Sequence, residues 1–329
     1  MSMTTGNMSL LTRAELWSQE LKDTLKDELM ARKYVRMLTE FPDGTTFTIP
    51  SVGDARTDDV VEDTDIQMRA LDTGEFQFTI DEYISSGHYI TRKAEQDSFY
   101  AAELVSSFVP KQNRAILEHF ETALLAKPDN GMASSATDPY LINGIAHRFS
   151  GGNSGTIELA DFAYANLALN TANVPAGNRI AIVPPEVAFY LDTLAALVAV
   201  SNNPKWEGIV ADGMADGMTF TKNVYGFDVY SSNYLPLSSS LTNAPNALDE
   251  RDQSTAGPNF TSTVGKPCYF FSATSDILPF VGAWRQEPMV DAEWVPRKQR
   301  TEIITTARYG VSLYRPENMV ICHTQTAIT

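Results

Sequence analysis

Near the start of the chain, apolar and polar residues alternate with the period of an α-helix. Spacings of three and four residues place the apolar positions on one helical face, and charged residues fill most of the remaining surface. The apolar stripe consists of Leu10, Ala14, Trp17, Leu21 and Leu25. We predict an amphipathic helix from residue 10 to about residue 38. Its stripe requires a partner surface, because it would otherwise stay in contact with water.

A turn pattern at residues 41–44 ends this helical period, and a period of two, typical of β-strands, follows. Apolar and polar residues alternate at 66–70 and again at 76–80. Between these runs, the Asp-Thr-Gly sequence at 72–74 is typical of a tight turn. The sequence therefore predicts a β-hairpin made of these two strands.

The same region has the most uneven charge of the chain. Residues 54–97 contain twelve acidic and four basic residues, against 41 acidic and 25 basic residues and a net charge of −16 for the whole chain. Two polar-faced strands with this charge could hardly form a core of their own, so we expect the hairpin to project and to pair with another surface. The alternative is a solvated hairpin at the edge of a compact domain.

A helical period returns at residues 97–126 and predicts a long helix. Pro110 lies inside it and is expected to kink or divide the helix, because proline lacks a backbone N–H and its ring clashes with the preceding turn. The Lys-Pro-Asp-Asn-Gly sequence at 127–131 is expected to end the helix.

The second half of the chain mixes helical and strand patterns. Helices are predicted from residue 156 to residue 167 and from residue 186 to residue 200, on either side of an apolar strand at 179–183. Further strands are predicted near 220–230 and at 267–271, and segments rich in Gly, Pro, Ser and Asn predict the loops 132–155, 202–218 and 237–264. This order favours an α+β fold with a mixed sheet covered by helices.

The chain is expected to end in a hairpin. Strand-like runs at 308–314 and 319–323 are separated by Arg-Pro-Glu-Asn at 315–318, which is a turn signal.

Composition and charge exclude several classes of protein. The chain of 329 residues is 43% hydrophobic and 20% charged, as in ordinary folded proteins, and its net charge of −16 argues against sequence-specific binding to nucleic acid. No apolar run is long enough to cross a bilayer, and residues 1–11 do not resemble a secretory signal, so we expect the chain to stay in the cytoplasm until it assembles. Cys268 and Cys322 lack companions for a zinc site and are expected to be reduced thiols.

Residues that commonly carry catalysis or bind metals show no productive spacing. The four histidines place no two ligands on one helix face, and no Gly-x-Ser-x-Gly motif is present. The glycines of 151–155 are not followed by Lys-Ser or Lys-Thr, and the repeated Ala-Asp-Gly-Met at 211–218 has too few carboxylates for a calcium loop. We therefore expect no enzyme, no cofactor and no metal. A catalytic triad formed only by folding stays open.

Three groups of residues resemble the Hong Kong 97-like fold of tailed-bacteriophage major capsid proteins. The first group is similar to the extended-loop region of that family and comprises Thr46 to Gly53, Gln67 to Leu71, Thr79 to Tyr83 and Ala94 to Ser98. The second, Gly177 to Glu186, is similar to the strand and helix that open the axial domain. The third, Gly310 to Val320 with its Arg-Pro-Glu sequence, is similar to the closing hairpin.

The resemblance implies a division of the chain into four parts. These are an N-terminal arm at 1–43, an extended β-hairpin loop at 44–96, a peripheral domain with a long spine helix at 97–155 and 285–329, and an axial domain with a mixed sheet at 156–284.

The resemblance also implies a function. It predicts a structural subunit that self-assembles into pentamers and hexamers of an icosahedral capsid around a double-stranded DNA genome. The expected partners are copies of the chain, a portal, scaffolding or decoration proteins, and packaged DNA bound without sequence specificity, with no membrane. The expected locations are the virion capsid and, before assembly, the host cytoplasm. An encapsulin-like compartment shell is the alternative within the fold, and a cytoplasmic hydrolase with an unrecognised site is the alternative outside it.

Charge suggests where copies would meet. A basic C-terminal segment of one subunit is expected to contact the acidic hairpin region of another. The candidate contact residues are Asp58, Asp59, Glu62, Asp63, Phe76 and Phe78 in the hairpin region, and Arg297, Lys298 and Arg300 in the basic segment. The alternative for the basic segment is a solvated strand.

Overall fold

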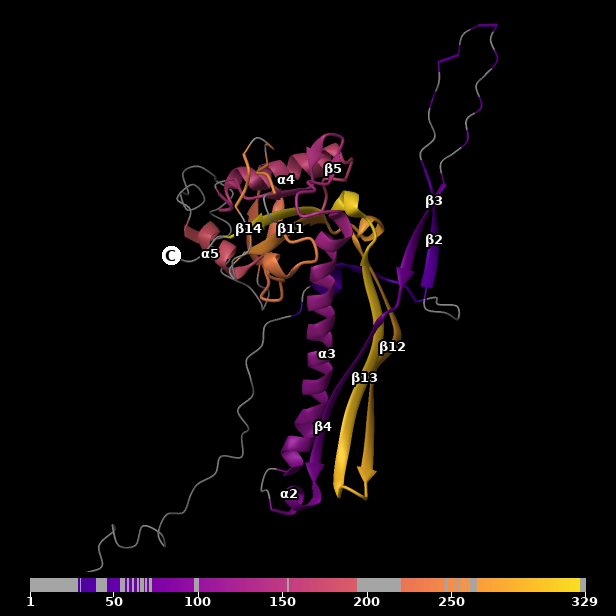
Figure 1. Ribbon diagram of the computed structural model, residues 1–329, viewed down its shortest axis with the longest axis vertical. Coiled ribbons are helices and arrows are strands. Elements are labelled where there is room, and N and C mark those ends of the chain that lie inside the picture. Colours follow the sequence, from indigo (N-terminus) through magenta and orange to yellow (C-terminus); the bar gives the residue numbers. More distant parts are fainter. Residues whose placement is uncertain are drawn as a thin grey trace, which may run out of the picture.

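The computed structural model is elongated, with a sheet-and-helix body at one end and a long helix-and-ribbon extension (Figure 1). It describes residues 29, 31–39, 46–53, 57, 59–60, 62–63, 65, 68, 70, 73–97, 101–152, 154–193, 220–245, 248–251, 253, 255–258, 260 and 265–325, with the backbone alone at 31, 101–107, 192 and 220–222. Residues 10–28 of the expected N-terminal helix lie outside the described residues. Its expected end is wrong, because residues 31–34 form the 3-10 helix η1 (Ala31–Tyr34) and residues 35–37 form the strand β1 (Val35–Met37).

The extension is built on a four-stranded sheet with the order β1-β12-β13-β4. Its long strands are β12 (Phe280–Val295) and β13 (Arg300–Leu313), which pair antiparallel, and β4 (Glu82–Thr91) pairs antiparallel with β13. Phe120 of the long helix stacks on Trp284 of β12 and meets Tyr309 of β13 edge to face, with ring centroids 4.9 and 5.0 Å apart. Buried aromatic rings therefore join the helix to the ribbon.

The long helix is α3 (Ala101–Met132), preceded by the short α2 (Arg92–Asp97). The expected long helix is confirmed, but it is not divided at Pro110 and does not end at 127–131, because it continues through Pro128 to Met132. Leu124, Leu125 and Met132 are buried in a core cluster on either side of Pro128. Burial of these side chains outweighs the local helix-breaking signal.

The body contains a six-stranded mixed sheet with the order β7-β14-β11-β8-β10-β9. Its strands are β7 (Arg148–Ser150), β8 (Arg179–Val183), β9 (Phe220–Val224), β10 (Phe227–Ser231), β11 (Lys266–Ser272) and β14 (Val320–Thr324). Every residue of β8 and of β14 is buried, as in a sheet covered on both faces. The strands expected at 179–183, 220–230 and 267–271 are confirmed.

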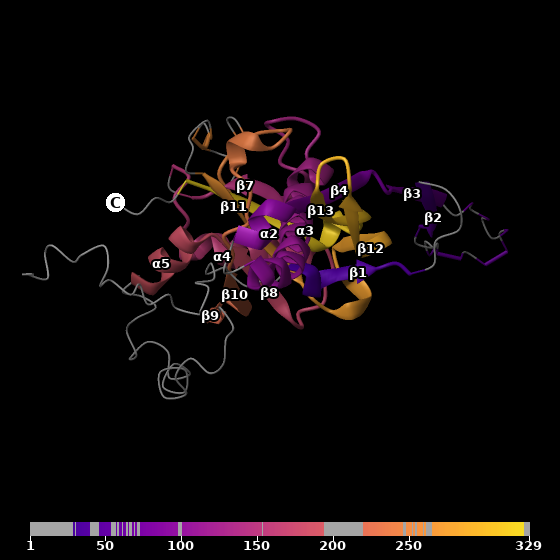
Figure 2. The same ribbon diagram turned by 90° about the horizontal axis from the view of Figure 1, so that it is seen from below.

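Alternate residues of this sheet enter two different cores. Ala181 and Phe270 face a cluster that contains residues of α4 (Leu159–Thr171) and α5 (Pro185–Thr193). Ile182 and Tyr269 face the cluster that contains the C-terminal half of α3. Figure 2 shows α4 and α5 on one side of the sheet and α3 on the other. The expected mixed sheet covered by helices follows directly from this period-two burial.

The expected terminal hairpin is wrong. β13 belongs to the four-stranded sheet, whereas β14 pairs with β11 and β7 in the six-stranded sheet. The residues expected to form its turn include the 3-10 helix η5 (Pro316–Asn318), which leads the chain from one sheet to the other. The segment at 315–318 does connect two strands, as predicted, but the strand with which each of them pairs depends on distant segments of the chain.

Candidate assembly surfaces

A projecting hairpin carries the expected acidic residues, but its strands differ from those predicted. β2 (Thr46–Val52) pairs antiparallel with β3 (Thr73–Thr79), so residues 73 and 74 lie in a strand and not in a turn. Residues 53–72, which we call the acidic loop, connect the two strands. The alternation at 66–70 led to the wrong strand, because the pairing partner of 73–79 is the Thr-Phe-Thr-Ile run at 46–49.

The described side chains of the acidic loop are exposed. Asp59, Glu62, Asp63 and Asp65 all belong to this group. Two large apolar side chains in the loop, Val60 and Met68, are 69% and 93% exposed. The loop thus presents carboxylates and apolar groups together, which is typical of a surface that becomes covered on association. Asp58 lies outside the described residues.

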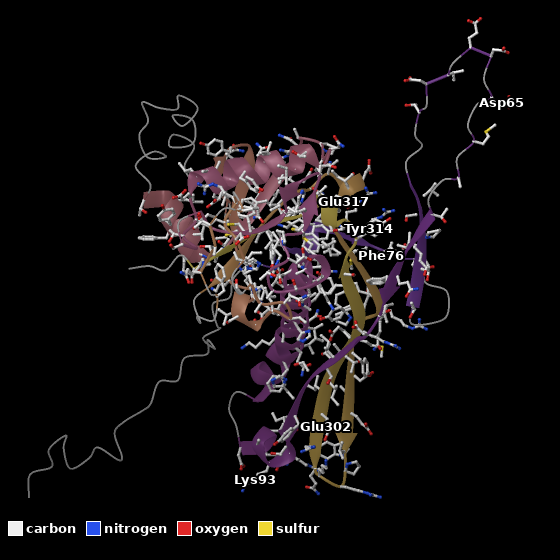
Figure 3. All side chains as sticks on the ribbon, turned by 45° about the horizontal axis from the view of Figure 1, so that its top comes forward. Asp65, Phe76, Lys93, Glu302, Tyr314 and Glu317 are labelled. Atoms are coloured by element: carbon white, nitrogen blue, oxygen red, sulfur yellow. The ribbon has the colours of Figure 1, made fainter. Side chains whose placement is uncertain are left out.

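The base of the hairpin packs on its own chain. Phe78 is 1% exposed and shares a core cluster with Ile80, Val281 and Ala283. Phe76 is half-buried and meets Tyr314 edge to face at 5.1 Å, and Figure 3 shows both rings where the hairpin joins the ribbon. The expectation that the hairpin lacks any intramolecular core is therefore wrong for its base. Phe78 is buried in the core of its own chain, so its ring is not exposed for contact with another copy. Contact of Phe76 with a neighbouring copy stays a prediction.

Gly310 permits the close approach of the hairpin to the ribbon. A Cβ atom at this position would lie 2.7 Å from the carbonyl oxygen of Thr79 and 3.0 Å from the Cα of Ile80. Backbone atoms cannot rotate away as a flexible side chain can. The absence of a side chain at residue 310 therefore helps to set the direction in which the acidic loop projects.

Basic residues gather at the far end of the ribbon. Arg297 and Lys298 are exposed in the connection between β12 and β13. The backbone N–H of Arg92 donates to the carbonyl of Gln299 at 2.9 Å, which brings exposed Arg92 and Lys93 of α2 beside them. We call these four residues the basic end. Sequence reasoning missed Arg92 and Lys93, because the predicted helix begins only at residue 97 and because folding alone brings these bases beside a turn that lies far later in the chain.

Arg300 has contacts within the chain that differ from those of Arg297 and Lys298. Its guanidinium lies over the ring of Tyr89, 4.3 Å from the centroid, and forms an ion pair with Glu302 at 2.6 Å. Arg300 therefore fastens β13 to β4, and its contact with another copy stays a prediction.

Folding does bring a serine, a histidine and an aspartate together inside the body. Ser238 Oγ lies 3.1 Å from His323 Nδ1, and His323 Nε2 lies 2.8 Å from Asp129 Oδ1. All three residues are 0% exposed. The Nε of Arg148 also donates to Asp129 Oδ1 at 2.7 Å. A hydroxyl that no substrate can reach cannot act as a nucleophile. The cluster instead joins α3, β7, β14 and the segment that contains Ser238.

The protonation of this cluster follows from its contacts. Burial alone would raise the pKa of Asp129, but His323 and Arg148 outweigh it and hold that pKa below its ordinary value. Burial lowers the pKa of His323, despite the opposing effect of Asp129. The neutral imidazole can then donate from Nε2 to Asp129 and accept the Ser238 hydroxyl at Nδ1. Asp129 and Arg148 remain as a buried ion pair with balanced charge.

The other sequence candidates for chemistry have structural roles. His88, His119 and His147 are hydrogen-bonded to Gln112, Tyr309 and the Met319 carbonyl. Cys268 and Cys322 face each other across β11 and β14 as free, buried thiols, and burial raises the pKa of each. Within the described ranges no His, Cys, Asp and Glu cluster could hold a metal ion. The repeat at 211–218 lies outside those ranges.

The glycine-rich segment at 151–155 is used for packing. The N–H of Gly151 donates to the His323 carbonyl at 2.9 Å, and that of Gly152 donates to Asp161 Oδ2 at 3.1 Å. These amides are therefore occupied and do not form a phosphate cradle. None of the helices in the described part of the chain is long and apolar enough to cross a membrane.

Comparison with known proteins agrees with this geometry. A family model described as phage capsid protein matches residues 74–321. No curated protein sequence matches the chain. Solved structures do, among them the capsid of cyanophage P-SCSP1u, with a TM-score of 0.72, 15% identity, and coverage of 99% of this chain and 96% of that one. The cyanophage Pam1 capsid asymmetric unit matches with a TM-score of 0.68 and 14% identity, over 100% of this chain and 99% of that one. The bacteriophage PhiM1 mature capsid matches with a TM-score of 0.66 and 11% identity, over 96% of this chain and 93% of that one. At these identities the likeness shows the fold, and the expected Hong Kong 97-like α+β fold is confirmed.

Proposed function

The chain belongs to the phage capsid protein family and is a structural capsid subunit, and from this premise we propose that its copies join head to tail into the pentamers and hexamers of an icosahedral shell. The acidic loop of one copy contacts the basic end of the next. The shell encloses a double-stranded DNA genome, and the family match favours this function over a compartment that packages enzymes.

One observation carries the proposal: the subunit has exposed groups of opposite charge at opposite ends. Figure 3 shows Asp65 of the acidic loop at one end of the molecule and Lys93 of the basic end at the other. Asp59, Glu62 and Asp63 are exposed in the loop, and Arg297 is exposed at the basic end. Because both groups point away from the body, they cannot meet within one elongated chain. Charge complementarity between two copies satisfies both.

The geometry of such a contact supports ring formation. A loop on one copy and the far end of a ribbon on the next are different surfaces, so their contact is heterologous. Heterologous contacts produce closed rings when the rotation between copies closes, as in pentamers and hexamers. The packing of Phe78 and the close approach at Gly310 support a fixed loop direction, and therefore a fixed rotation.

The four-part division expected from the sequence is retained as part of the proposal, with an arm at 1–43, an extended loop at 44–96, a peripheral domain at 97–155 and 285–329, and an axial domain at 156–284. The strands do not respect this division: β7 and β14 come from the peripheral ranges, yet β14 pairs with both β7 and β11, and β11 belongs to the axial range. We expect neither domain to fold alone. A fragment of residues 156–284 that unfolded cooperatively by itself would contradict this.

The remaining partners follow from the shell. Packaged DNA faces a chain of net charge −16, so we expect no sequence-specific contact and little affinity in solution. A portal and scaffolding or decoration proteins are the other expected partners. The subunit would occupy the host cytoplasm before assembly and the virion capsid afterwards.

A charge-exchange experiment tests the loop contact. Glu62→Lys with Asp63→Lys should leave the subunit folded but prevent shells, because two attractive contacts become repulsive. Adding Arg297→Glu with Lys298→Glu in the same chain should restore shells. Negative-stain electron microscopy measures assembly, and thermal unfolding measures folding. As a matched control, Asp276→Lys with Glu317→Lys reverses two exposed acids on the body and should leave assembly unchanged. Normal shells from the first variant would refute the proposed contact.

A further inference from the structure

Strand β4 leaves one edge of the four-stranded sheet open. The backbone N–H of Arg92 donates to the carbonyl of Gln299 at 2.9 Å and continues the ladder in which Thr91 lies opposite Arg300. Because alternate residues of an antiparallel strand bond to the same neighbour, the even-numbered residues of β4 use their N–H and C=O groups for β13. The odd-numbered residues point theirs the other way, and we call them the open edge: Tyr83, Ser85, Gly87, Tyr89 and Thr91. In the part of the chain that the structure describes, no strand other than β13 pairs with β4.

The open edge lacks the features that commonly protect a sheet edge from pairing, which are proline, lysine and bulges. Residues 83–91 contain no proline, lysine or arginine, and β4 pairs with β13 in unbroken register. Tyr83 and Tyr89 are 67% and 59% exposed, so the side chains of the edge are accessible as well. An edge of this kind is a template for pairing with another strand.

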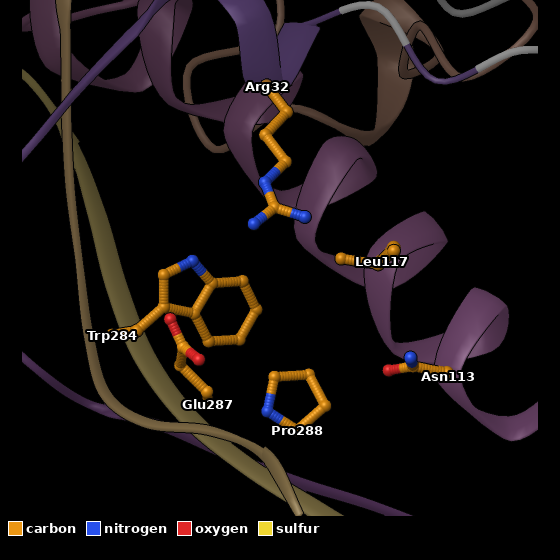
Figure 4. Close-up of a pocket in the computed structure, with 6 residues that line it drawn as sticks. All are labelled: Arg32, Asn113, Leu117, Trp284, Glu287 and Pro288. Atoms are coloured by element: carbon orange, nitrogen blue, oxygen red, sulfur yellow. The ribbon is translucent and has the colours of Figure 1, made fainter. Parts of the chain in front are cut away.

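The other long edge of the same sheet is protected. Beyond β1, which pairs with residues 280–282, that edge is formed by β12. β12 contains Pro288, which lacks an N–H, and its register shifts between Trp284 and Gln286 and again before Met289. Figure 4 shows Pro288 where a pocket of 230 Å³ opens between β12 and α3. Strand pairing with another molecule is therefore favoured at β4 and disfavoured at β12.

We propose that the open edge pairs antiparallel with the open edge of a second copy, about a two-fold axis at Gly87. In this register Ser85 lies opposite Tyr89 of the second copy, and Tyr83 lies opposite Thr91. The two edges form about ten backbone hydrogen bonds, two for each pair of opposite residues. The contact is isologous, because both copies use the same surface.

Charged residues at the two ends of the open edge are complementary in this register. Pairing centred on Gly87 places Glu82 opposite Arg92. It also places Asp81 opposite Lys93, and both pairs occur at each end of the contact. Asp81, Arg92 and Lys93 are exposed, so the pairs form without rearrangement of the body. Opposite charges facing each other across strands stabilise the pairing.

Neighbouring registers lose this complementarity. A pairing centred on His88 would place Asp81 opposite Glu95, and like charges that face each other oppose association. A pairing centred on Ser86 would place Lys93 opposite Thr79, which carries no charge. The charges therefore select the register centred on Gly87.

This contact goes beyond the head-to-tail contact proposed above. Contacts between the acidic loop and the basic end close a ring, but a shell also needs contacts that join one ring to the next. An isologous contact supplies a two-fold junction of this kind, and this role in a shell rests on the proposed function. The pairing itself does not, because it uses Asp81 and Glu82 in place of the acidic loop and leaves Arg297 and Lys298 to that loop.

Cysteine crosslinking of the full-length chain tests the register. After mild oxidation of shells and free subunits together, Gly87→Cys should give an interchain dimer on a non-reducing gel, because the two Cα atoms would lie about 5.5 Å apart. The added Cβ has room, since its nearest neighbour would be a side-chain carbon of Ile304 at 3.6 Å. Cys268 and Cys322 are both 0% exposed and give little background.

Ser85→Cys is the matched control on the same edge. The two copies of this residue would lie about 14 Å apart along the paired strands, so Ser85→Cys alone should give no dimer. Tyr89→Cys alone should give none for the same reason. Co-expression of the Ser85→Cys and Tyr89→Cys chains should give a mixed dimer, because these two positions face each other. Thermal unfolding measures whether each variant remains folded.

Charge reversal tests the ends of the contact. Asp81→Lys with Glu82→Lys, added to Gly87→Cys, should reduce the crosslinked fraction several-fold, because the attractive pairs at both ends become repulsive. Asp276→Lys with Glu317→Lys reverses two exposed acids on the body and should leave the crosslinked fraction unchanged.

The outcomes distinguish this contact from chance collisions and from the loop contact. A Gly87→Cys dimer and a mixed dimer, without dimers of the single controls, support the proposal. Absence of either dimer, a dimer of Ser85→Cys alone, or crosslinking that survives the reversal at residues 81 and 82 overturns it. Normal shells from the Glu62→Lys, Asp63→Lys variant would refute the loop contact and leave this result unaffected.

Discussion

Charged side chains at the C-terminal end of α3 differ in their surroundings from those of the acidic loop. Asp129, Arg148 and His323 are 0% exposed, and both Arg148 and His323 bind Asp129. Asp59 and Glu62 are exposed and form no ion pair within the described part of the chain. The buried group needs its partners to stay folded, because desolvated charge without a partner is costly, whereas exposed charge remains solvated. Mutations should therefore affect stability in the first region and assembly in the second.

The largest expected effect on stability comes from Asp129→Ala. It leaves the guanidinium of Arg148 buried without its carboxylate, and we expect a loss of about 3 to 5 kcal/mol in the free energy of unfolding. Asp129→Asn keeps an acceptor and should lose less. Urea unfolding of unassembled subunits measures both. A loss below about 1 kcal/mol for the alanine variant would show that the buried pair contributes little to the fold.

Gly310→Ala should have the next largest effect, because its Cβ would lie 2.7 Å from the Thr79 carbonyl. We expect a loss of about 1 to 3 kcal/mol, as for other overpacked sites, and impaired assembly because the loop direction changes. Gly87→Ala on β4 is the matched control, since the nearest atom to its Cβ is a side-chain carbon of Ile304 at 3.6 Å. Equal stability losses for the two variants would argue against a special approach at Gly310.

Acid should weaken the buried region through its histidines. Burial lowers the pKa of both His147 and His323 in the folded chain, so below about 6.5 the unfolded chain binds protons that the folded chain does not. Stability from these groups is present above that pH and is lost as the pH falls through their folded pKa values. The lowered pKa of Asp129 adds a further loss below about 3.9. Urea midpoints should fall from pH 8 to pH 5, and the fall should shrink in a His147→Gln, His323→Gln variant. A midpoint independent of pH would contradict this assignment.

The smallest effect on stability is expected at the basic end. Arg300→Ala loses the stacking on Tyr89 and should cost about 0.5 to 1 kcal/mol. Arg297→Ala should leave the urea midpoint unchanged while reducing the yield of shells, because that side chain is solvated in the free subunit. A clear loss of stability in Arg297→Ala would show that the exposed bases are needed for folding.

Prediction from sequence succeeded where neighbouring residues decide the outcome. The long helix, the strand at 179–183 and the mixed character of the second half follow from local periodicity, which reflects how side chains repeat along a helix or strand. The acidic imbalance of 54–97 is likewise a property of composition. The candidate contact residues were likewise predicted from local charge. The structure places Arg297 and Lys298 beside Arg92 and Lys93, two bases that sequence reasoning missed.

Sequence by itself thus determined the type of several elements, among them the long helix and the strand at 179–183, and the charge of the projecting region. Only the tertiary structure decided that β3 pairs with 46–52, that β13 and β14 enter different sheets, and that α3 continues through Pro128. The physical reason is that periodicity is a short-range signal, whereas strand pairing and helix ends here depend on burial against segments far away in the chain. Phe78 shows this most directly: its polar-faced strand suggested projection, yet its ring is buried beside Val281.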